Sequence, residues 1–338
     1  MSVMSIVEAL NTALVEEMRR DERVFCLGED ISDANGGYGG AWAVTRGLHD
    51  EFGAQRVLNT PISEILIAGA SVGAAMAGMR PVADLQYGDF IFCMMDQLVN
   101  QAAKMCYMSG GKVHVPMVLR APVGASTRGA QHAQSLEGFF THVPGLKIVC
   151  PATAYDAKGL LKSAIRDDNP VIVFEHKLLY GGKRVERDAL STKGEVPEDD
   201  YTVPFGEAVV RREGSDITIV ANLLMMYRAL EAAEELEKQG ISCEVIDPRT
   251  LVPFDYQTVI NSLRKTKRLM IVHEDTYTNG WGAQLGSYIA EHEIYLLDAP
   301  IKRVATYDVP IPFAPVMENF VVPSVKRIID EANQLMKA

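Results

Sequence analysis

The side chains that could do chemistry in this chain lie where predicted strands end. Glu64 opens an apolar helix after an extended stretch, and His132 follows a glycine-containing loop. Gln86 and Phe90 come just past a strand. Ligands of open α/β sheets bind outside the carboxyl ends of the strands, so these positions are candidates for one site. A carboxylate and a histidine can hold or move a proton, and an aromatic ring offers a flat apolar face.

Each of these residues also has a purely structural interpretation. Glu64 could serve the macrodipole of the helix that it opens. His132 could be a capped histidine within its loop, and Phe90 could belong to the hydrophobic core. The residue pattern alone leaves both interpretations open.

Common catalytic and nucleotide-binding motifs are missing from the sequence. No G-x-G-x-x-G follows a predicted strand, since the run from Gly37 begins like one and ends in Trp42. There is also no Walker motif, no H-E-x-x-H and no G-x-S-x-G. The cysteines are scattered without a C-x-x-C pair, which argues against a zinc site or a disulfide framework and fits a reducing compartment.

Length and charge exclude several classes of protein. The 338 residues predict two domains. A net charge of −11 repels phosphate backbones, and there is no polybasic run to attract an anionic membrane. The apolar run Ile65–Met79 is shorter than the about 20 residues that a membrane-spanning helix needs. No basic residue precedes Arg19, so a secretory or transit signal is not indicated. We expect a cytoplasmic protein that binds neither nucleic acid nor membrane.

Strands and helices alternate along both halves of the chain, which predicts an α/β fold with a mainly parallel sheet. The first half carries predicted strands at 24–27, 80–86, 115–120 and 171–175, and predicted helices at 62–78, 90–108 and 154–166. The charged stretch 182–200 lacks apolar periodicity and is predicted to be a linker. The second half carries predicted strands at 217–221, 243–247, 269–273 and 301–305, and predicted helices at 227–239, 254–264, 282–292 and 324–336.

The predicted helix 62–78 is built largely from small residues. Gly69 and Gly73 lie four positions apart, on one face. Each internal glycine costs a helix about 1 kcal/mol relative to alanine, so close approach of another backbone is the expected compensation. The helix could therefore be buried under a sheet or lie at a subunit interface.

A longer pattern runs in order over nearly the whole chain. Its stretches are VLNTPISE (57–64), GAAMAGMRPVADLQYGDF (73–90), DQLVNQAAKMCYMSGG (96–111), GAQHAQSLEGFFTHVPGLKIVCP (129–151), DAKGLLKSAIRDDNPVIVFEHKLLYG (156–181), EVIDPRTLVPFD (244–255) and LDAPIKRV (297–304). The sequence thereby resembles the β subunit of thiamin-diphosphate-dependent 2-oxo acid dehydrogenases, the decarboxylating component of the pyruvate, branched-chain and acetoin dehydrogenase complexes.

The resemblance implies a two-domain α/β fold. Residues 1–181 would form the thiamin pyrimidine-binding domain, a three-layer α/β domain of the transketolase type. Residues 182–200 would be the linker. Residues 201–338 would form the transketolase-type C-terminal α/β domain, which binds no cofactor itself.

The resemblance also implies roles for the candidate residues. Glu64 matches the glutamate that hydrogen-bonds N1′ of the aminopyrimidine, where a shared proton promotes formation of the reactive thiazolium carbanion. Gln86 and Phe90 match residues that contact that ring and stack on it, and Ile62 matches a neighbouring apolar contact. His132 matches the active-site histidine, which can move a proton as the acyl group passes to a lipoyl thiol.

A structural potassium site is also implied by the resemblance. It would be built from main-chain carbonyls and one aspartate, oxygen ligands that suit a hard cation. The matching residues are Met117, Ala164, Ile165, Asp167 and Asn169.

The diphosphate half of the cofactor has no motif in this chain. Thiamin enzymes that hold Mg²⁺ and the diphosphate use a Gly-Asp-Gly run followed by an Asn, whereas this chain has Gly88-Asp89-Phe90. The resemblance therefore implies a partner α subunit that holds the diphosphate and Mg²⁺, in an assembly of two α and two β chains. It further implies acyl transfer to the lipoyl domain of a dihydrolipoyl acyltransferase.

Several alternatives for the function remain at this point. Gln86 is shared with branched-chain and some acetoin-type members, whereas Lys193–Glu198 resembles pyruvate and acetoin types. We expect pyruvate or acetoin as substrate, with branched-chain 2-oxo acids second. A non-catalytic assembly subunit of the same fold is a further alternative, which the intact Glu64, Phe90 and His132 oppose. A single-chain transketolase-like enzyme is opposed by the length and by the missing diphosphate motif.

Overall fold

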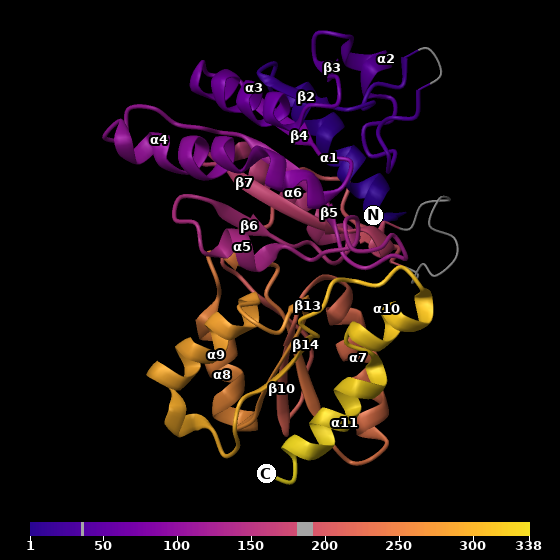
Figure 1. The fold of residues 1–338 in the computed structure, drawn as a ribbon, viewed down its shortest axis with the longest axis vertical. Helices are drawn as coiled ribbons and strands as arrows, with labels where there is room; N and C mark the ends of the chain where they lie inside the picture. The colour runs from indigo at the N-terminus through magenta and orange to yellow at the C-terminus, as the bar shows by residue number, and fades with distance from the viewer. Residues whose placement is uncertain (35–36, 181–191) are drawn as a thin grey trace. The chain divides into compact units, whose positions relative to one another are not determined.

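The computed structural model describes residues 1–34, 37–180 and 192–338, which divide into two compact units (Figure 1). Unit 1 comprises residues 1–123 and 140–205, and unit 2 comprises residues 124–139 and 206–338. The predicted linker 182–200 lies partly outside the described residues, and its part from 192 onward is grouped with unit 1. Residues 124–139, which contain His132, are grouped with unit 2, although they lie between segments of unit 1 in the sequence.

Unit 1 is built around a parallel sheet with strands in the order β6-β7-β5-β4-β2-β3, which confirms the predicted α/β class. The register places Gly28 of β2 opposite both Asn59 of β3 and Asp84 of β4. Except for the edge strand β3, which exposes Leu58 and Asn59, the strands are almost entirely buried, as expected for a parallel sheet that is covered on both faces. Their bounds are Val24–Gly28 (β2), Val57–Asn59 (β3), Arg80–Asp84 (β4), Val118–Val123 (β5), Lys147–Val149 (β6) and Val171–His176 (β7).

The helices of unit 1 begin at the capping signals that the sequence carries. Ser5 and Glu8 form a reciprocal capping box at the start of α1, and the Thr153 side chain caps α6. Helices α1 and α6 pack on each other, and α3 packs on β4. The α-helices of unit 1 are α1 (Ile6–Arg20), α2 (Leu48–Phe52), α3 (Glu64–Met76), α4 (Ala103–Met108) and α6 (Ala154–Arg166), and α5 (Glu137–Thr141) spans the boundary with unit 2.

The stretch predicted as one helix over 90–108 is divided into three kinds of helix. A 3₁₀ helix covers Gly88–Met94, π-helical turns cover Asp96–Ala102, and the α-helical part is only α4. Gly88 is tightly packed, because a Cβ there would lie 2.9 Å from the Pro122 carbonyl oxygen. The 3₁₀ helix begins at this close approach and carries Phe90.

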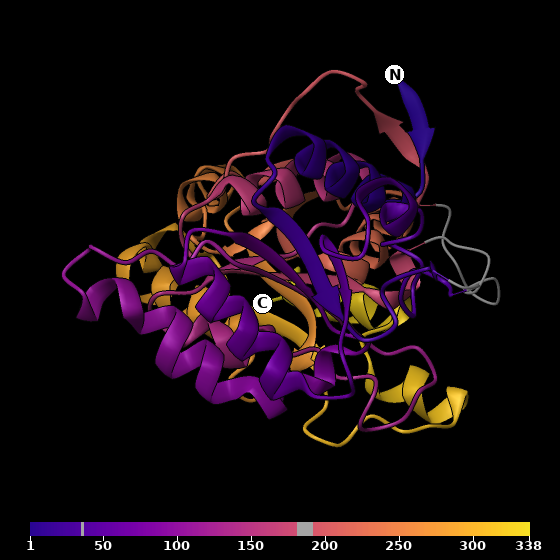
Figure 2. The ribbon, with the colours of Figure 1, turned by 90° about the horizontal axis from the view of Figure 1, so that it is seen from above.

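Two short strands pair at the N-terminal edge of unit 1. Strand β1 (Ser2–Met4) is antiparallel to β8 (Gly194–Val196), with Val3 opposite Glu195 (Figure 2). Part of the predicted linker is therefore a paired strand.

Unit 2 has a sheet with strands in the order β14-β13-β10-β11-β9, parallel except for the β9 and β11 pair. Figure 1 shows α8 and α9 on one side of this sheet and α7 and α11 on the other. The predicted alternation is confirmed, whereas β9, β12 and α10 were not predicted. The bounds are Val209–Arg212 (β9), Ile217–Ala221 (β10), Leu223–Glu237 (α7), Cys243–Asp247 (β11), Thr250–Val252 (β12), Tyr256–Thr266 (α8), Leu269–Thr276 (β13), Trp281–His292 (α9), Lys302–Thr306 (β14), Pro315–Val321 (α10) and Val325–Leu335 (α11).

A membrane crossing requires a helix that is both long and apolar. Among the helices of the described residues, none combines the length and the apolar character needed for a membrane crossing.

Candidate functional site

Three neighbouring strands of unit 1 bring polar side chains to one edge of the sheet. Strands β3, β2 and β4 are adjacent and parallel, so their carboxyl ends lie together. Glu29 follows β2, Gln86 follows β4, and Glu64 opens α3 after β3. The register that aligns the last residues of these strands therefore places two carboxylates and one amide at the carboxyl edge of the sheet, the edge at which open α/β sheets bind ligands.

Glu29 links the two sequence-predicted residues of this edge. Its carboxylate accepts a hydrogen bond from the backbone N–H of Ser63, next to Glu64. Its backbone carbonyl accepts a hydrogen bond from Nε2 of Gln86. Burial and the nearby Glu64 carboxylate raise the pKa of Glu29. Glu29 was not predicted, although it follows a buried strand just as Gln86 does.

The start of α3 leaves its first side chains open to solvent. Glu64 is half-buried in the first turn, and Ile62 before it is 84% exposed. Ser63 makes no side-chain capping bond, and its carbonyl accepts from the backbone N–H of Ile67 at 3.0 Å. Within the described residues, Glu64 and Ile62 are thus available to a ligand that lies over this edge.

Aromatic rings hold the segment from Gln86 to Phe90. The Trp42 indole Nε1 donates a hydrogen bond of 2.9 Å to the Gln86 carbonyl. The Trp42 ring lies 5.8 Å from the Tyr87 ring and 5.3 Å from the Tyr180 ring. Tyr87 and Phe90 meet edge to face, with their ring centroids 5.9 Å apart. Phe90 is only half-buried, so part of it is open to a planar ligand.

A buried ionic cluster lies behind that segment. The Arg120 guanidinium binds Glu175 through two hydrogen bonds of 2.9 and 2.7 Å and also pairs with Asp84, the last residue of β4. The Tyr180 hydroxyl donates to Glu175 at 2.7 Å. Burial, opposed by Arg120, raises the pKa of Asp84 to about 6. This cluster ties β4, β5 and β7 together immediately before the turn that carries Gln86.

His132 is found in unit 2, in the segment 124–139. Its imidazole is half-buried, and its backbone N–H donates to the Gly129 carbonyl at 3.1 Å. Gly129 has a φ of +78°, a conformation that glycine adopts readily. The structure thus presents the candidate histidine on a tight turn.

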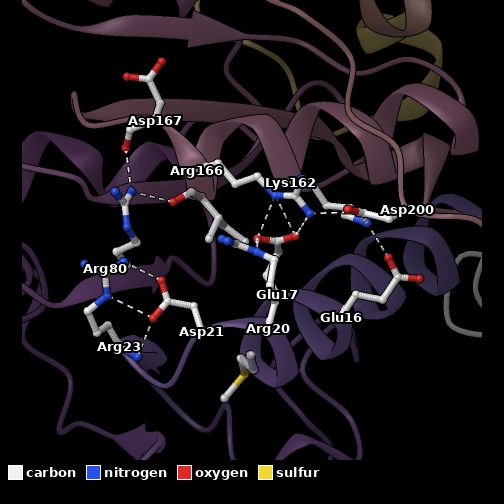
Figure 3. Close-up of polar contacts among 12 residues, drawn as sticks. Glu16, Glu17, Arg20, Asp21, Arg23, Arg80, Lys162, Arg166, Asp167 and Asp200 are labelled. Atoms are coloured by element: carbon white, nitrogen blue, oxygen red, sulfur yellow. Dashed lines mark hydrogen bonds and ion pairs between the residues drawn. The ribbon is translucent and has the colours of Figure 1, made fainter.

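Four residues of the implied potassium site, Ala164, Ile165, Asp167 and Asn169, lie at or just after the end of α6, and Figure 3 shows Asp167 beside Arg80. Both the backbone and the side-chain N–H groups of Asn169 donate to Oδ1 of Asp167, at 2.8 and 2.9 Å. Lys147 pairs with Oδ2 of the same carboxylate. Although burial acts to raise it, these hydrogen bonds lower the pKa of Asp167 below its ordinary value.

The carbonyls implied as potassium ligands already accept hydrogen bonds. Arg80 donates to the carbonyls of Ile165 and Asp167 at 2.9 and 3.0 Å. The Met117 carbonyl accepts from the backbone of β7 at 3.0 Å, and the Ala164 carbonyl accepts from Asp167 at 3.3 Å. A carbonyl oxygen has two lone pairs, so each could still face a cation. Within residues 1–34, 37–180 and 192–338, no group of three or more His, Cys, Asp or Glu side chains could hold a metal ion.

A second charged cluster connects α1 with α6 (Figure 3). Glu17 is fully buried and pairs with Arg20 at 2.8 Å and with Arg166 at 2.6 Å. Glu16 pairs with Lys162 at 2.5 Å. The hollow beside them has a volume of about 440 Å³ and is lined by both signs of charge, from Glu16, Glu17, Arg19, Arg20, Lys162, Arg166, Glu198 and Asp200. Most of these charges pair with one another across the two helices, so we interpret the cluster as a structural contact between α1 and α6.

Comparison with known families covers both halves of the chain. Residues 2–183 match the family described as transketolase, pyrimidine binding domain. Residues 206–328 match the family described as transketolase, C-terminal domain. A solved structure described as a split gene transketolase, inactive β4 tetramer, is similar with a TM-score of 0.78 and covers 99% of each chain. Its sequence identity of 22% limits that likeness to the fold.

Curated relatives align over almost the full length of the chain. The 2-oxoisovalerate dehydrogenase subunit beta of Bacillus subtilis is 48% identical, over 95% of this chain and 94% of its own. The acetoin:2,6-dichlorophenolindophenol oxidoreductase subunit beta of Cupriavidus necator is 46% identical, over 99% and 98%. The pyruvate dehydrogenase E1 component subunit beta of Rickettsia felis is 44% identical, over 98% of both.

Proposed function

Since this chain belongs to the family of β subunits of pyruvate, acetoin and branched-chain 2-oxo acid dehydrogenases, we propose that it holds the pyrimidine half of thiamin diphosphate. The observation that carries the proposal is the sheet edge in unit 1. There, the Glu64 carboxylate follows β3, and the Gln86 amide and the half-buried Phe90 ring follow β4, on either side of β2 in the parallel sheet. This donor set suits an aminopyrimidine, which needs a proton partner at a ring nitrogen, a hydrogen-bonding contact and a flat apolar surface.

Each residue of the proposed site has one task. When bound, thiamin diphosphate supplies the electron sink for cleaving the bond beside the substrate carbonyl. Glu64 holds and moves a proton at N1′ of the pyrimidine, as a general acid–base group. Phe90 stacks on the ring, Gln86 fixes its orientation, and Ile62 gives an apolar contact that excludes water. Glu29 supports the start of α3 by accepting a hydrogen bond from the backbone N–H of Ser63.

His132 is proposed to act after the cofactor has been activated. A histidine is suited to passing a proton near neutral pH. We assign it to the step in which the acyl group reaches the lipoyl thiol of a dihydrolipoyl acyltransferase. His132 and Glu64 thus serve different steps, which separate assays can distinguish.

A partner α subunit is proposed to hold the other half of the cofactor. The chain has Gly88-Asp89-Phe90 where a diphosphate motif would need Gly-Asp-Gly followed by Asn. The relatives are themselves named as beta subunits. We propose an assembly of two α and two β chains, with Mg²⁺ and the diphosphate on α. Potassium is proposed at Met117, Ala164, Ile165, Asp167 and Asn169.

Helix α3 is proposed as the contact between the two β chains. Its exposed side carries small and apolar residues, and a Cβ at Gly73 would meet no atom within 4 Å. Gly73→Leu should therefore leave the single chain folded, since leucine is also the better helix former. In the assembly, the same side chain would overpack the contact and promote dissociation, which sedimentation velocity measures. An unchanged assembly would remove α3 from the proposed contact.

The substrate is proposed to be pyruvate or acetoin, with branched-chain 2-oxo acids as the alternative. The relatives carry names from all three types, so similarity alone does not choose. The five cysteines are free, which suits the reducing cytoplasm that we propose as the location.

The deciding experiment is turnover of pyruvate, acetoin and 3-methyl-2-oxobutanoate by the chain reconstituted with its α subunit. We expect lipoyl-dependent turnover, with the largest kcat/KM for pyruvate or acetoin. A preference for 3-methyl-2-oxobutanoate would establish the branched-chain alternative. No turnover of any of them by a correctly assembled complex would favour a non-catalytic assembly subunit.

A further inference from the structure

The segment that carries His132 is attached to unit 2 by carboxylates. Glu318 of α10 accepts two hydrogen bonds, of 2.8 and 3.1 Å, from the backbone N–H of Thr127. Glu274 of β13 accepts a hydrogen bond from the backbone N–H of Ala125. All of these residues belong to unit 2, so the contacts are internal to it.

A third carboxylate holds the far end of the same segment. Asp275 accepts a hydrogen bond of 2.9 Å from the backbone N–H of Gly138. A Cβ at Gly138 would lie 2.6 Å from that carboxylate oxygen, so glycine is what permits the approach. The base of the loop is closed by a bond of 2.9 Å from the Gly124 N–H to the Gln134 carbonyl. His132 therefore lies between two anchored ends.

The carboxylates in these contacts are buried. Their burial favours the one loop conformation in which they receive hydrogen bonds. Glu274 and Glu318 are each 7% exposed, and Asp275 is 5% exposed. Burying a carboxylate is unfavourable unless hydrogen bonds replace its lost water, and bonds to a charged acceptor are the stronger kind. Moving the loop would take these backbone donors away from carboxylates that solvent does not reach.

The backbone at Thr127 supports the same conclusion. Thr127 has a φ of +56°, a conformation that is an outlier for a β-branched residue. Such strain persists only where the surroundings fix it, and it gathers at functional sites. At Thr127, both oxygens of Glu318 receive the strained N–H group.

We propose that Glu318 and Glu274 are positioning residues that fix the loop presenting His132, and that this is a task of the C-terminal domain in the reaction. The inference rests on the proposed function, because it takes His132 as the residue that acts in acyl transfer. It gives unit 2 an influence on one step of the reaction. Asp275 anchors the other end of the segment at Gly138.

The first test measures the loop without using activity. Hydrogen–deuterium exchange of the full chain is followed by mass spectrometry in peptides covering residues 124–136. Glu318→Ala should raise amide exchange in these peptides severalfold, whereas Glu318→Gln, which keeps one acceptor oxygen, should raise it less. Glu291→Gln, an exposed carboxylate change on α9, is the matched control and should leave exchange unchanged. Equal exchange in wild type and Glu318→Ala would overturn the inference.

The second test uses the complex reconstituted with the α subunit. Glu318→Ala should lower kcat for lipoyl-dependent turnover by roughly 10-fold to 10²-fold, the scale of a misplaced catalytic group. The kcat/KM for the 2-oxo acid and the H/D exchange at thiamin C2 should stay within about twofold, because both report steps that precede acyl transfer.

A double variant separates this inference from the proposed function. If Glu318 acts through His132, Glu318→Ala combined with His132→Ala should be no slower than His132→Ala alone. Fully additive losses would overturn the positioning role. If His132→Ala itself leaves turnover unchanged, the role proposed for His132 is wrong, while the exchange measurement still decides whether Glu318 holds the loop.

Discussion

The two regions that carry the candidate residues are held in place by different means. At the edge of unit 1, parallel strands in register place Glu64 and Gln86. In segment 124–139, a strained loop is held by carboxylates that come from much later in the chain. The first arrangement is set by the sheet itself, and the second depends on a few buried hydrogen bonds. A single substitution should therefore be able to loosen segment 124–139 without disturbing the rest of the fold.

The largest effect is expected at the sheet edge itself. Glu64→Gln keeps the shape of the side chain and removes the group that holds the proton. H/D exchange at C2 of bound thiamin diphosphate should slow by roughly 10²–10⁴-fold in the reconstituted complex. Glu22→Gln, an exposed carboxylate change after α1, is the matched control and should not alter exchange. An exchange rate equal to that of the wild type would refute this role for Glu64.

The next effect concerns the support of that edge. Arg120→Met removes a cation that is 2% exposed and leaves Asp84 and Glu175 buried without it. Loss of one partner from a buried ionic group typically costs about 3–5 kcal/mol, so the free energy of unfolding should fall by that order. Urea denaturation followed by circular dichroism measures it.

Two further variants sharpen the Arg120 prediction. Arg19→Met removes a surface ion pair with Glu51 and should change the free energy of unfolding far less. Adding Asp84→Asn and Glu175→Gln to Arg120→Met should recover part of the loss, because no buried charge then remains unpaired. Equal losses for Arg120→Met and Arg19→Met would show that the buried cluster does not support the sheet edge.

The smallest effect is a pH dependence in the second region. Burial and the nearby Asp275 raise the pKa of Glu137 to about 8, from an ordinary value of 4.5. An acid whose folded-state pKa is raised binds more protons when folded, so stability falls as pH rises from about 4.5 to about 8. Burial raises the pKa of Asp275 to about 6. Its ionisation therefore also lowers stability as pH rises, over a lower pH range than that of Glu137.

Glu137→Gln should remove the part of this decline that lies near neutral pH. Burial lowers the pKa of His273 to about 3, so that residue affects stability only below its ordinary value of 6.5. Between pH 6.5 and 8.5, the window set by these two groups, wild type should lose at least about 1 kcal/mol that the variant keeps. Urea midpoints at the two pH values measure this, with Glu291→Gln as control. Parallel declines in wild type and Glu137→Gln would contradict a raised pKa.

The candidate residues of the sheet edge could be predicted from sequence, because a polar residue that directly follows a strand is visible in the local sequence. Gln86 and Glu64 each follow a strand, and the family resemblance then assigned them roles. Glu29 obeys the same rule after Val24–Gly28, and attention to every strand end would have found it. The helix predicted over 90–108 was correct as a helical stretch, but its 3₁₀ and π turns depend on packing at Gly88 that no local pattern records.

The anchoring of the histidine loop could not be predicted. Glu318 lies 191 positions from Thr127, and Asp275 lies 137 positions from Gly138. Nothing in the local sequence around Glu318 distinguishes a buried acceptor from an exposed carboxylate on a short helix. The sequence did place His132 on a glycine loop, but the grouping of residues 124–139 with unit 2 follows only from the folded contacts.

Isothermal titration of the purified chain with thiamin diphosphate and Mg²⁺, without and then with the α subunit, tests the central claim most directly. That claim is that this chain binds only the pyrimidine half of the cofactor. We predict weak binding by the chain alone, since the charged half of the ligand has no partner on it, and tight binding at one cofactor per αβ pair once α is added. Tight stoichiometric binding by the isolated chain would contradict the account.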